Sequence, residues 1–261
     1  MNYEELYSSL APLGADLKTA ANNIAKFQKA ILKDADTGNL SDMKKCLSSI
    51  KEASASLEKA ISEYEAAASA FDTAVYFSDG DFSRQLVATC KEKGVDVKGE
   101  KGLYEMFPYK IRVASDSQEV FMNRKKISSF RPSYIAETIR AGQEKLNKAS
   151  FKPASFLAEL ADAYEITCLR SGARFGSSQM LTKIYKNLAL MARARKEYDM
   201  QAFAFDLARL YAAGPDEWIV SKTGQHYTFG TSRDGKSGIR VLGRTGIETY
   251  ILTFSAVNTA E

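Results

Sequence analysis

The most distinctive candidate functional residues of this chain are basic, and the chemistry that they favour is the binding of an anion. Guanidinium and ammonium groups bind phosphate and carboxylate oxygens. The candidate anion-binding residues are Lys110, Arg112, Arg124, Lys125, Lys126, Arg131, Arg233, Lys236, Arg240 and Arg244. Four of them fall in a single stretch, MNRKKISSFRPS at positions 122–133. The stretch is either an anion-binding surface or the ordinary solvated end of a strand before a helix.

The elements around this stretch favour a basic surface beside a helix end. YKIRVA at 109–114 alternates in the manner of a half-buried strand, which places Lys110 and Arg112 together on its outer face. Pro132 restricts the preceding residue to an extended conformation, and Ser133 is a suitable cap for a following helix. Free backbone N–H groups at a helix N-terminus attract anions. Both interpretations of the stretch remain open.

The N-terminal part has the clearest periodicity, because its apolar residues recur at alternating spacings of three and four. The first series is Leu10, Leu13, Leu17, Ala20, Ile24, Phe27 and Ile31. The second is Leu47, Ile50, Ser54, Leu57, Ile61, Tyr64, Ala68 and Phe71. Between them DADTGNLS predicts a turn with its tip near Gly38 and Ser41 as the next helix cap. We expect a coiled-coil-like antiparallel hairpin that packs on its own body, on a second copy or on another protein.

The whole chain is predicted to be an α+β protein of three parts. Residues 1–75 form the helical hairpin, 76–150 a small sheet with helices, and 151–261 three helices followed by an antiparallel β-meander. Alternatively, the last two parts share one domain. Helices followed by a meander are also the element order of a winged-helix module, in which RDGK at 233–236 would occupy a wing tip.

Other chemistries find little support in the sequence. The three cysteines are widely separated, and His226 is the only histidine, so neither a zinc-ligand pair nor a histidine relay can be read. The glycine-rich loop at 171–179 lacks the Gly-Lys-Ser/Thr of a P-loop. Asp79 and Asp81 are a close acidic pair that turn formation explains equally well. We predict no catalytic residue, no metal site and no cofactor.

The expected function is therefore binding. Residues 1–72 contain eight lysines, no arginine and eleven acidic residues, so the net positive charge lies in the rest of the chain. We expect a non-enzymatic accessory or adaptor subunit of a larger assembly, located in the cytoplasm and without a membrane segment. Its hairpin would bind a protein partner or a second copy, and its basic surface a nucleic-acid backbone or an acidic protein face. The alternative is a sequence-nonspecific DNA- or RNA-binding protein, and a third possibility is a carboxylate-dependent hydrolase.

Overall fold

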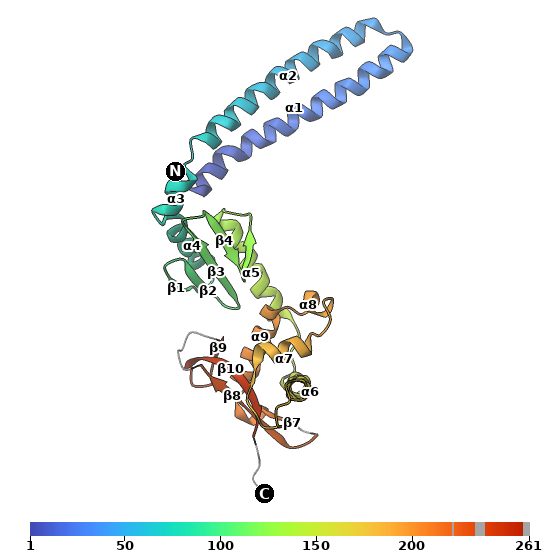
Figure 1. Ribbon diagram of the computed structural model, residues 1–261. Helices are drawn as coiled ribbons and strands as arrows, with labels where there is room; N and C mark the ends of the chain where they lie inside the picture. Colours follow the sequence, from blue (N-terminus) through green and yellow to red (C-terminus); the bar gives the residue numbers. More distant parts are fainter. Residues whose placement is uncertain (221, 233–237, 258–261) are drawn as a thin grey trace. The chain divides into compact units, whose positions relative to one another are not determined.

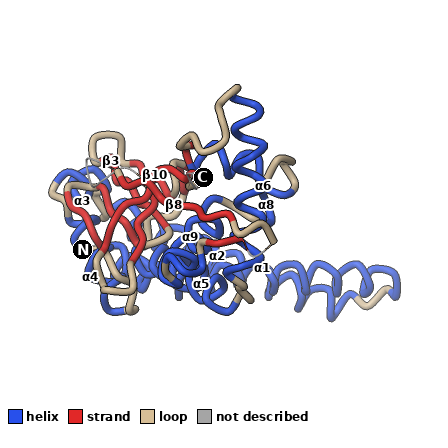
Figure 2. Tube along the Cα trace, turned by 90° about the horizontal axis from the view of Figure 1, so that it is seen from below, coloured by secondary structure: helices blue, strands red, loops and turns tan. Residues whose placement is uncertain are grey.

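The computed structural model describes residues 1–220, 222–232 and 238–257 and confirms the α+β class (Figure 1). Figure 2 distinguishes the helices, in blue, from the strands, in red. The helices described are α1 (Tyr3–Thr37), α2 (Leu40–Ser69), α3 (Thr73–Ser78), α4 (Asp81–Glu92), α5 (Pro132–Lys148), α6 (Pro153–Ser171), α7 (Leu181–Leu188), α8 (Ala194–Glu197), α9 (Met200–Ala213) and the 3₁₀ turn η1 (Pro215–Glu217). The strands described are β1 (Lys98–Glu100), β2 (Leu103–Met106), β3 (Tyr109–Ala114), β4 (Glu119–Met122), β5 (Lys125–Ile127), β6 (Gln179–Met180), β7 (Ile219–Val220), β8 (Gln225–Thr231), β9 (Ile239–Leu242) and β10 (Glu248–Ala256).

The strands form two sheets. The first has the order β1-β2-β3-β4-β5, and the second the order β6-β10-β8-β7 with β9 also pairing with β10. The strand predicted at 109–114 is confirmed as β3, and strands are confirmed in the C-terminal part. The predicted meander order is wrong, because β10 pairs with both β8 and β9 instead of β9 lying between its neighbours in sequence. The short strands β1, β5 and β6 were not predicted, because two or three residues cannot display an alternating pattern.

Contacts divide the chain into two compact units. Unit 1 comprises Met1–Val95, Glu100–Leu103 and Ile111–Thr138, and unit 2 comprises Asp96–Gly99, Tyr104–Lys110 and Ile139–Glu261. The division into parts at residues 75 and 150 stays a prediction. Among the described residues, no helix is both long enough and apolar enough to cross a membrane.

The ends of the hairpin helices follow local sequence. Asn2 accepts hydrogen bonds from the backbone of Glu4 and Glu5, and the Glu5 side chain accepts one from the Asn2 backbone, which forms a capping box at the start of α1. Gly38 ends α1 with a left-handed backbone, φ 71°, which confirms the predicted tip. The predicted cap of α2 was wrong by two residues, because Asn39 accepts the bond from the Asp42 backbone and Ser41 lies inside the helix.

The seam between α1 and α2 is rotated on one helix relative to the prediction. The predicted α1 series does face α2, since none of its residues is exposed and Ala20 is buried. On α2, however, the buried residues are Ala53 and Ala60, one position before the predicted Ser54 and Ile61. Small alanine side chains let the two helices approach closely, so the larger Ile61 is displaced to the flank and is 42% exposed.

An aromatic cluster joins the base of the hairpin to the rest of unit 1. The ring of Tyr3 lies 4.6 Å from that of Phe71, 5.1 Å from Tyr76 and 6.4 Å from Phe82. Phe82 is fully buried and stacks on Phe77 at 4.8 Å. Burying rings of this size contributes about 2 kcal/mol each through removal of apolar surface from water. The hairpin is therefore anchored at its base by hydrophobic packing.

Unit 2 has its own core between helices and sheet. The helix α6 supplies Leu157, Leu160 and Tyr164, and the second sheet supplies residues that include Ile251 and Phe254. The last of the helices predicted after residue 151 is α9, and it buries the residues Phe203, Ala204, Leu207 and Leu210. A helix with this buried face has few side chains left to read base edges.

Candidate functional site

The basic surface predicted in unit 1 is built on the β3–β4–β5 meander. Arg112 on β3 lies opposite Phe121 on β4, and Phe121 lies opposite Lys126 on β5. Directly opposed residues share a face of a sheet, so these three side chains form one row. The Arg112 guanidinium lies 4.0 Å from the centre of the Phe121 ring, a cation–π contact. Lys126 Nζ lies 2.6 Å from Oε1 of Glu119, which neutralises this lysine.

Arg124 and Lys125 remain directed to solvent. Arg124 occupies the turn between β4 and β5 with φ 69°, and Lys125 begins β5 opposite Met122. Both side chains are exposed, and neither has an ion pair within the residues that the structure describes. Together Arg124, Lys125 and Lys126 are called the basic turn below. Of the predicted set, Arg112 and Lys126 share one face of the sheet in unit 1. Lys125 lies on the other face, opposite Met122, and Arg124 lies in the turn between the strands.

Arg131 already binds a carboxylate, that of Glu4 at the start of α1. Arg131 Nε lies 3.0 Å from Glu4 Oε2, and the guanidinium lies 3.5 Å from the centre of the Tyr7 ring. The backbone N–H of Ser133 donates to Glu4 Oε1 at 2.8 Å, and the Ser133 hydroxyl donates to Oε2 at 3.0 Å. The helix N-terminus predicted to attract an anion does so here, and the anion is part of the same chain.

The charge of Glu4 is stabilised by these contacts. Burial acts to raise the pKa of the Glu4 carboxyl, but the hydrogen bonds from Ser133 and Arg131 and the charge of Arg131 outweigh it, so the pKa lies below its ordinary value. Nothing in the sequence signals this pair, because its members are separated by more than 120 residues. The contact fastens the N-terminus of α1 to that of α5 within unit 1.

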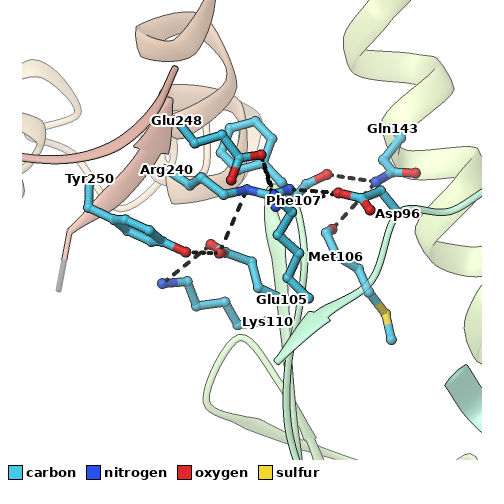
Figure 3. Close-up of polar contacts among 10 residues, drawn as sticks. Asp96, Glu105, Met106, Phe107, Lys110, Gln143, Arg240, Glu248 and Tyr250 are labelled. Carbon is cyan, nitrogen blue, oxygen red and sulfur yellow. Dashed lines mark hydrogen bonds and ion pairs between the residues drawn. The ribbon is translucent and has the colours of Figure 1, made fainter. Parts of the chain in front are cut away.

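Arg240 on β9 lies inside an ion cluster of unit 2 (Figure 3). Its residue surface is only 9% exposed. The two terminal nitrogens both lie 3.4 Å from Asp96 Oδ2, Nε lies 3.7 Å from Glu105 Oε2, and one terminal nitrogen lies 4.0 Å from Glu248 Oε1. A guanidinium surrounded by three carboxylates is an internal structural ion rather than a free ligand for an external anion.

The same cluster includes Lys110, another member of the predicted set. Lys110 Nζ lies 3.6 Å from Glu105 Oε1, and the Tyr250 hydroxyl donates to Glu105 Oε2 at 2.9 Å. Burial and the hydrogen bond to Glu105 raise the pKa of Tyr250. Lys98 pairs with Glu248, and its hydrogen bond lowers the pKa of that carboxyl. We call Arg240, Asp96, Glu105, Glu248, Lys98, Lys110 and Tyr250 the Arg240 cluster; its three cations balance its three carboxylates.

The remaining predicted residues lie in the C-terminal part. Arg244 is exposed, with its Nη1 atom 3.3 Å from Asp216 Oδ2. Arg233 and Lys236 lie outside the described residues. The predicted anion-binding residues are therefore not one surface. Some are paired with carboxylates of their own unit, and the exposed basic turn and Arg112 are distributed over both faces and the turn of the sheet in unit 1.

Unit 2 also contains a cavity that the sequence did not indicate. It has a volume of about 460 Å³, and its lining includes Phe151, Phe156, Glu159, Tyr198 and Asp206. The Tyr198 hydroxyl donates to Asp206 Oδ2 at 2.9 Å. Burial raises the pKa of the Asp206 carboxyl, and neither this hydrogen bond nor the nearby charge of Arg209 offsets it fully. Burial and the charge of Asp206 likewise raise the pKa of Tyr198.

The residues that line this cavity determine which kind of group it could bind. Glu159 and Asp206 bring negative charge to a wall that also carries aromatic rings, a combination that suits a positively charged group. Lys152 lines the same cavity and reduces its net charge. One sequence feature could have indicated this cavity. Asp206 is an acidic residue within the mostly apolar stretch QAFAFDLARL of α9.

The residues considered for catalysis or metal binding have ordinary surroundings. His226 is exposed on β8, and Asp81 pairs with Arg84 at the start of α4. All three cysteines are free. Within the described residues, no group of three or more histidine, cysteine or acidic side chains is placed to hold a metal ion.

On the hairpin, the structure leaves a stripe of three apolar residues and one serine at least partly uncovered. Leu47, Ser54, Ile61 and Ala68 recur every seven residues along α2 and therefore share one face of the helix. Leu47 is 46% exposed and Ile61 is 42% exposed. We call these four residues the flank stripe. It lies beside the seam with α1 and is accessible along most of the helix.

Comparison of the chain with protein-family models, with curated proteins and with solved structures finds no match. The winged-helix resemblance considered for residues 151–261 is therefore not confirmed. In the structure, the helix that would read DNA is α9, whose apolar face is buried, and the wing-tip residues 233–236 fall outside the described part of the chain.

Proposed function

We propose that the protein is a non-enzymatic accessory or adaptor subunit of a larger intracellular assembly, whose α1–α2 hairpin is its protein-binding arm. The observation that carries this proposal is the uncovered flank stripe. The buried residues described in α1 and α2 are Ala20, Ala53 and Ala60, whereas larger apolar side chains such as Leu47 and Ile61 face solvent. Exposed apolar side chains that repeat along one face of a helix are typical of a binding site for another helix.

The proposal gives the basic turn and Arg112 a second contact, with an anionic partner. That partner is a nucleic-acid backbone or an acidic face of a protein. Arg124 and Lys125 support this role because they are exposed and are not neutralised by a carboxylate within the described residues. Contacts of this kind position a partner without reading its sequence.

The test is an affinity purification of the tagged chain from its native host, with half of the sample treated with nuclease. The wild type is compared with L47S/I61S, which makes the flank stripe polar, and with the control S48N/S62N, which alters the next residue along the same helix. We expect a stoichiometric protein partner, resistant to nuclease, that the wild type and the control capture and L47S/I61S loses. Recovery of nucleic acid with no dependence on the flank stripe would instead favour a direct DNA- or RNA-binding protein.

A further inference from the structure

The flank stripe is bordered by a column of charged residues whose sign changes halfway along α2. Positions 44, 51, 58 and 65 each lie three residues before or four residues after a stripe residue, so they border it on the helix surface. They are Lys44, Lys51, Glu58 and Glu65. The half nearer the hairpin tip is thus positive, and the half nearer the base is negative.

None of these four side chains has a hydrogen bond or an ion pair within the described part of the chain. The neighbouring helix charges do pair locally, since Lys45 contacts Asp42 at 2.8 Å and Lys59 contacts Glu63 at 3.8 Å. All four residues of the column are exposed. The charges beside the flank stripe are therefore available to a partner, unlike the locally paired Lys45 and Lys59.

The order of charges selects one type of partner. A second α2 helix running in the opposite direction would place its Glu65 and Glu58 beside Lys44 and Lys51. A parallel helix would place lysine beside lysine and glutamate beside glutamate. Opposite charges beside an apolar stripe stabilise one orientation of paired helices and like charges destabilise the other.

We propose that the hairpin binds the hairpin of a second copy of this chain, with the two α2 helices antiparallel and the flank stripes in contact. This proposal rests on the proposed function of the hairpin as a protein-binding arm and names its partner. Ser54 lies at the two-fold axis opposite its counterpart, and Leu47 of each copy packs against Ile61 of the other. The four helices then form an antiparallel bundle in which the stripes become core.

The closing experiment reverses charges in the full-length chain and measures its mass by sedimentation equilibrium. The wild type is expected to be a dimer. The variants K44E/K51E and E58K/E65K each place like charges together and are expected to weaken self-association by at least about tenfold. An equimolar mixture of the two restores opposite charges and is expected to form a heterodimer. The variant carrying all four changes is self-complementary again and is expected to dimerise as the wild type does.

The position of the two-fold axis is tested by cross-linking. S54C treated with a short thiol cross-linker is expected to give a covalent dimer, because its two copies meet at the axis. S56C lies on a different face of the same helix and is expected to give no more dimer than the wild type with its own three cysteines. Circular dichroism of every variant verifies that the helices remain folded.

Several outcomes would overturn the proposal. A monomeric wild type at high micromolar concentration would do so, as would charge variants that dimerise normally, or a mixture that fails to recover. A monomeric wild type whose captured protein partner still depends on Leu47 and Ile61 would leave the adaptor proposal standing. A wild-type dimer that the charge-reversal variants weaken and their mixture restores, but that captures no other protein, would uphold self-association and remove the adaptor role.

Discussion

Arg240 and Arg124 carry the same guanidinium group in two different settings. Arg240 is surrounded by Asp96, Glu105 and Glu248 in unit 2, whereas Arg124 occupies an exposed turn of unit 1 without a described carboxylate partner. In one region the cation holds its own unit together, and in the other it is available to an external ligand. A basic residue is therefore available to an external anion only where the fold places no carboxylate beside it.

The largest effect is expected from removing the cation of the Arg240 cluster. R240M leaves three carboxylates together without their shared partner, which should lower the free energy of unfolding by about 3 kcal/mol. Urea denaturation measures this loss. The control is R244M, whose exposed pair with Asp216 is worth less than about 1 kcal/mol. Equal stabilities for the two variants would contradict the difference between a structural and a solvated arginine.

The contact of Glu4 with Arg131 and Ser133 is also a structural ion pair, and its removal is expected to cost less stability than removal of Arg240. E4Q removes the charge that Arg131 and Ser133 bind, and it should cost about 1–2 kcal/mol. The exposed α2 residue Glu52 supplies the control E52Q.

The pH dependence of this pair has a defined sign. Because the pKa of Glu4 is lowered in the folded chain, the wild-type contribution is present above the ordinary value of 4.5 and is lost as the pH falls through the lower folded value. Denaturation midpoints of the wild type and E4Q should therefore converge on acidification. A difference between the two midpoints that does not change with pH would show that the charge of Glu4 does not stabilise the fold.

The contribution of Asp206 to stability is expected to change with pH in the opposite direction to that of Glu4. Its raised pKa means that the folded chain binds its proton more tightly, so stability falls as the pH rises from 3.8 through the higher folded value. D206N should reduce this fall while still accepting the Tyr198 hydrogen bond, with a difference below about 1 kcal/mol at neutral pH. Thermal melts over a pH series compare it with D162N on the exposed side of α6. Parallel pH profiles would count against a desolvated Asp206.

The basic turn should have the smallest effect on stability and the clearest effect on binding. Replacing Arg124, Lys125 and Lys126 with alanine is expected to change the free energy of unfolding by less than about 1 kcal/mol, since only the exposed Lys126 pair is lost. Fluorescence anisotropy with a single-stranded DNA oligonucleotide measures affinity over a salt series. The salt slope should fall by about 2 if the turn contacts phosphates.

A charge-matched control separates this local contact from the net charge of the chain. Alanine replacement of the exposed Lys91, Lys183 and Lys186 removes the same number of cations from α4 and α7. An equal loss of affinity in the two triple variants would show that the basic turn is not a defined contact. A large fall in melting temperature for the turn variant alone would make its residues structural.

The local helices, turns and strands of this protein could be predicted from neighbouring residues in the chain. Residues close together in sequence are enough to predict the heptads of α1, the turn at Gly38 and the alternation of β3. The helix and strand periods that underlie these patterns follow from backbone geometry. Even the self-complementary charges of α2 are a property of one helix. Such features need no knowledge of distant residues.

Tertiary structure alone decided which side chains are available. Glu4 reaches Arg131, and Asp96 reaches Arg240, across more than 120 residues of sequence, and no local pattern predicts such pairs. The rotation of the α2 seam was likewise decided by packing, because alanines at positions 53 and 60 allow a closer approach than Ser54 and Ile61 would. The charge of a side chain follows from its residue type. Its availability to an external ligand depends on how strongly it already interacts with the groups that the fold places beside it.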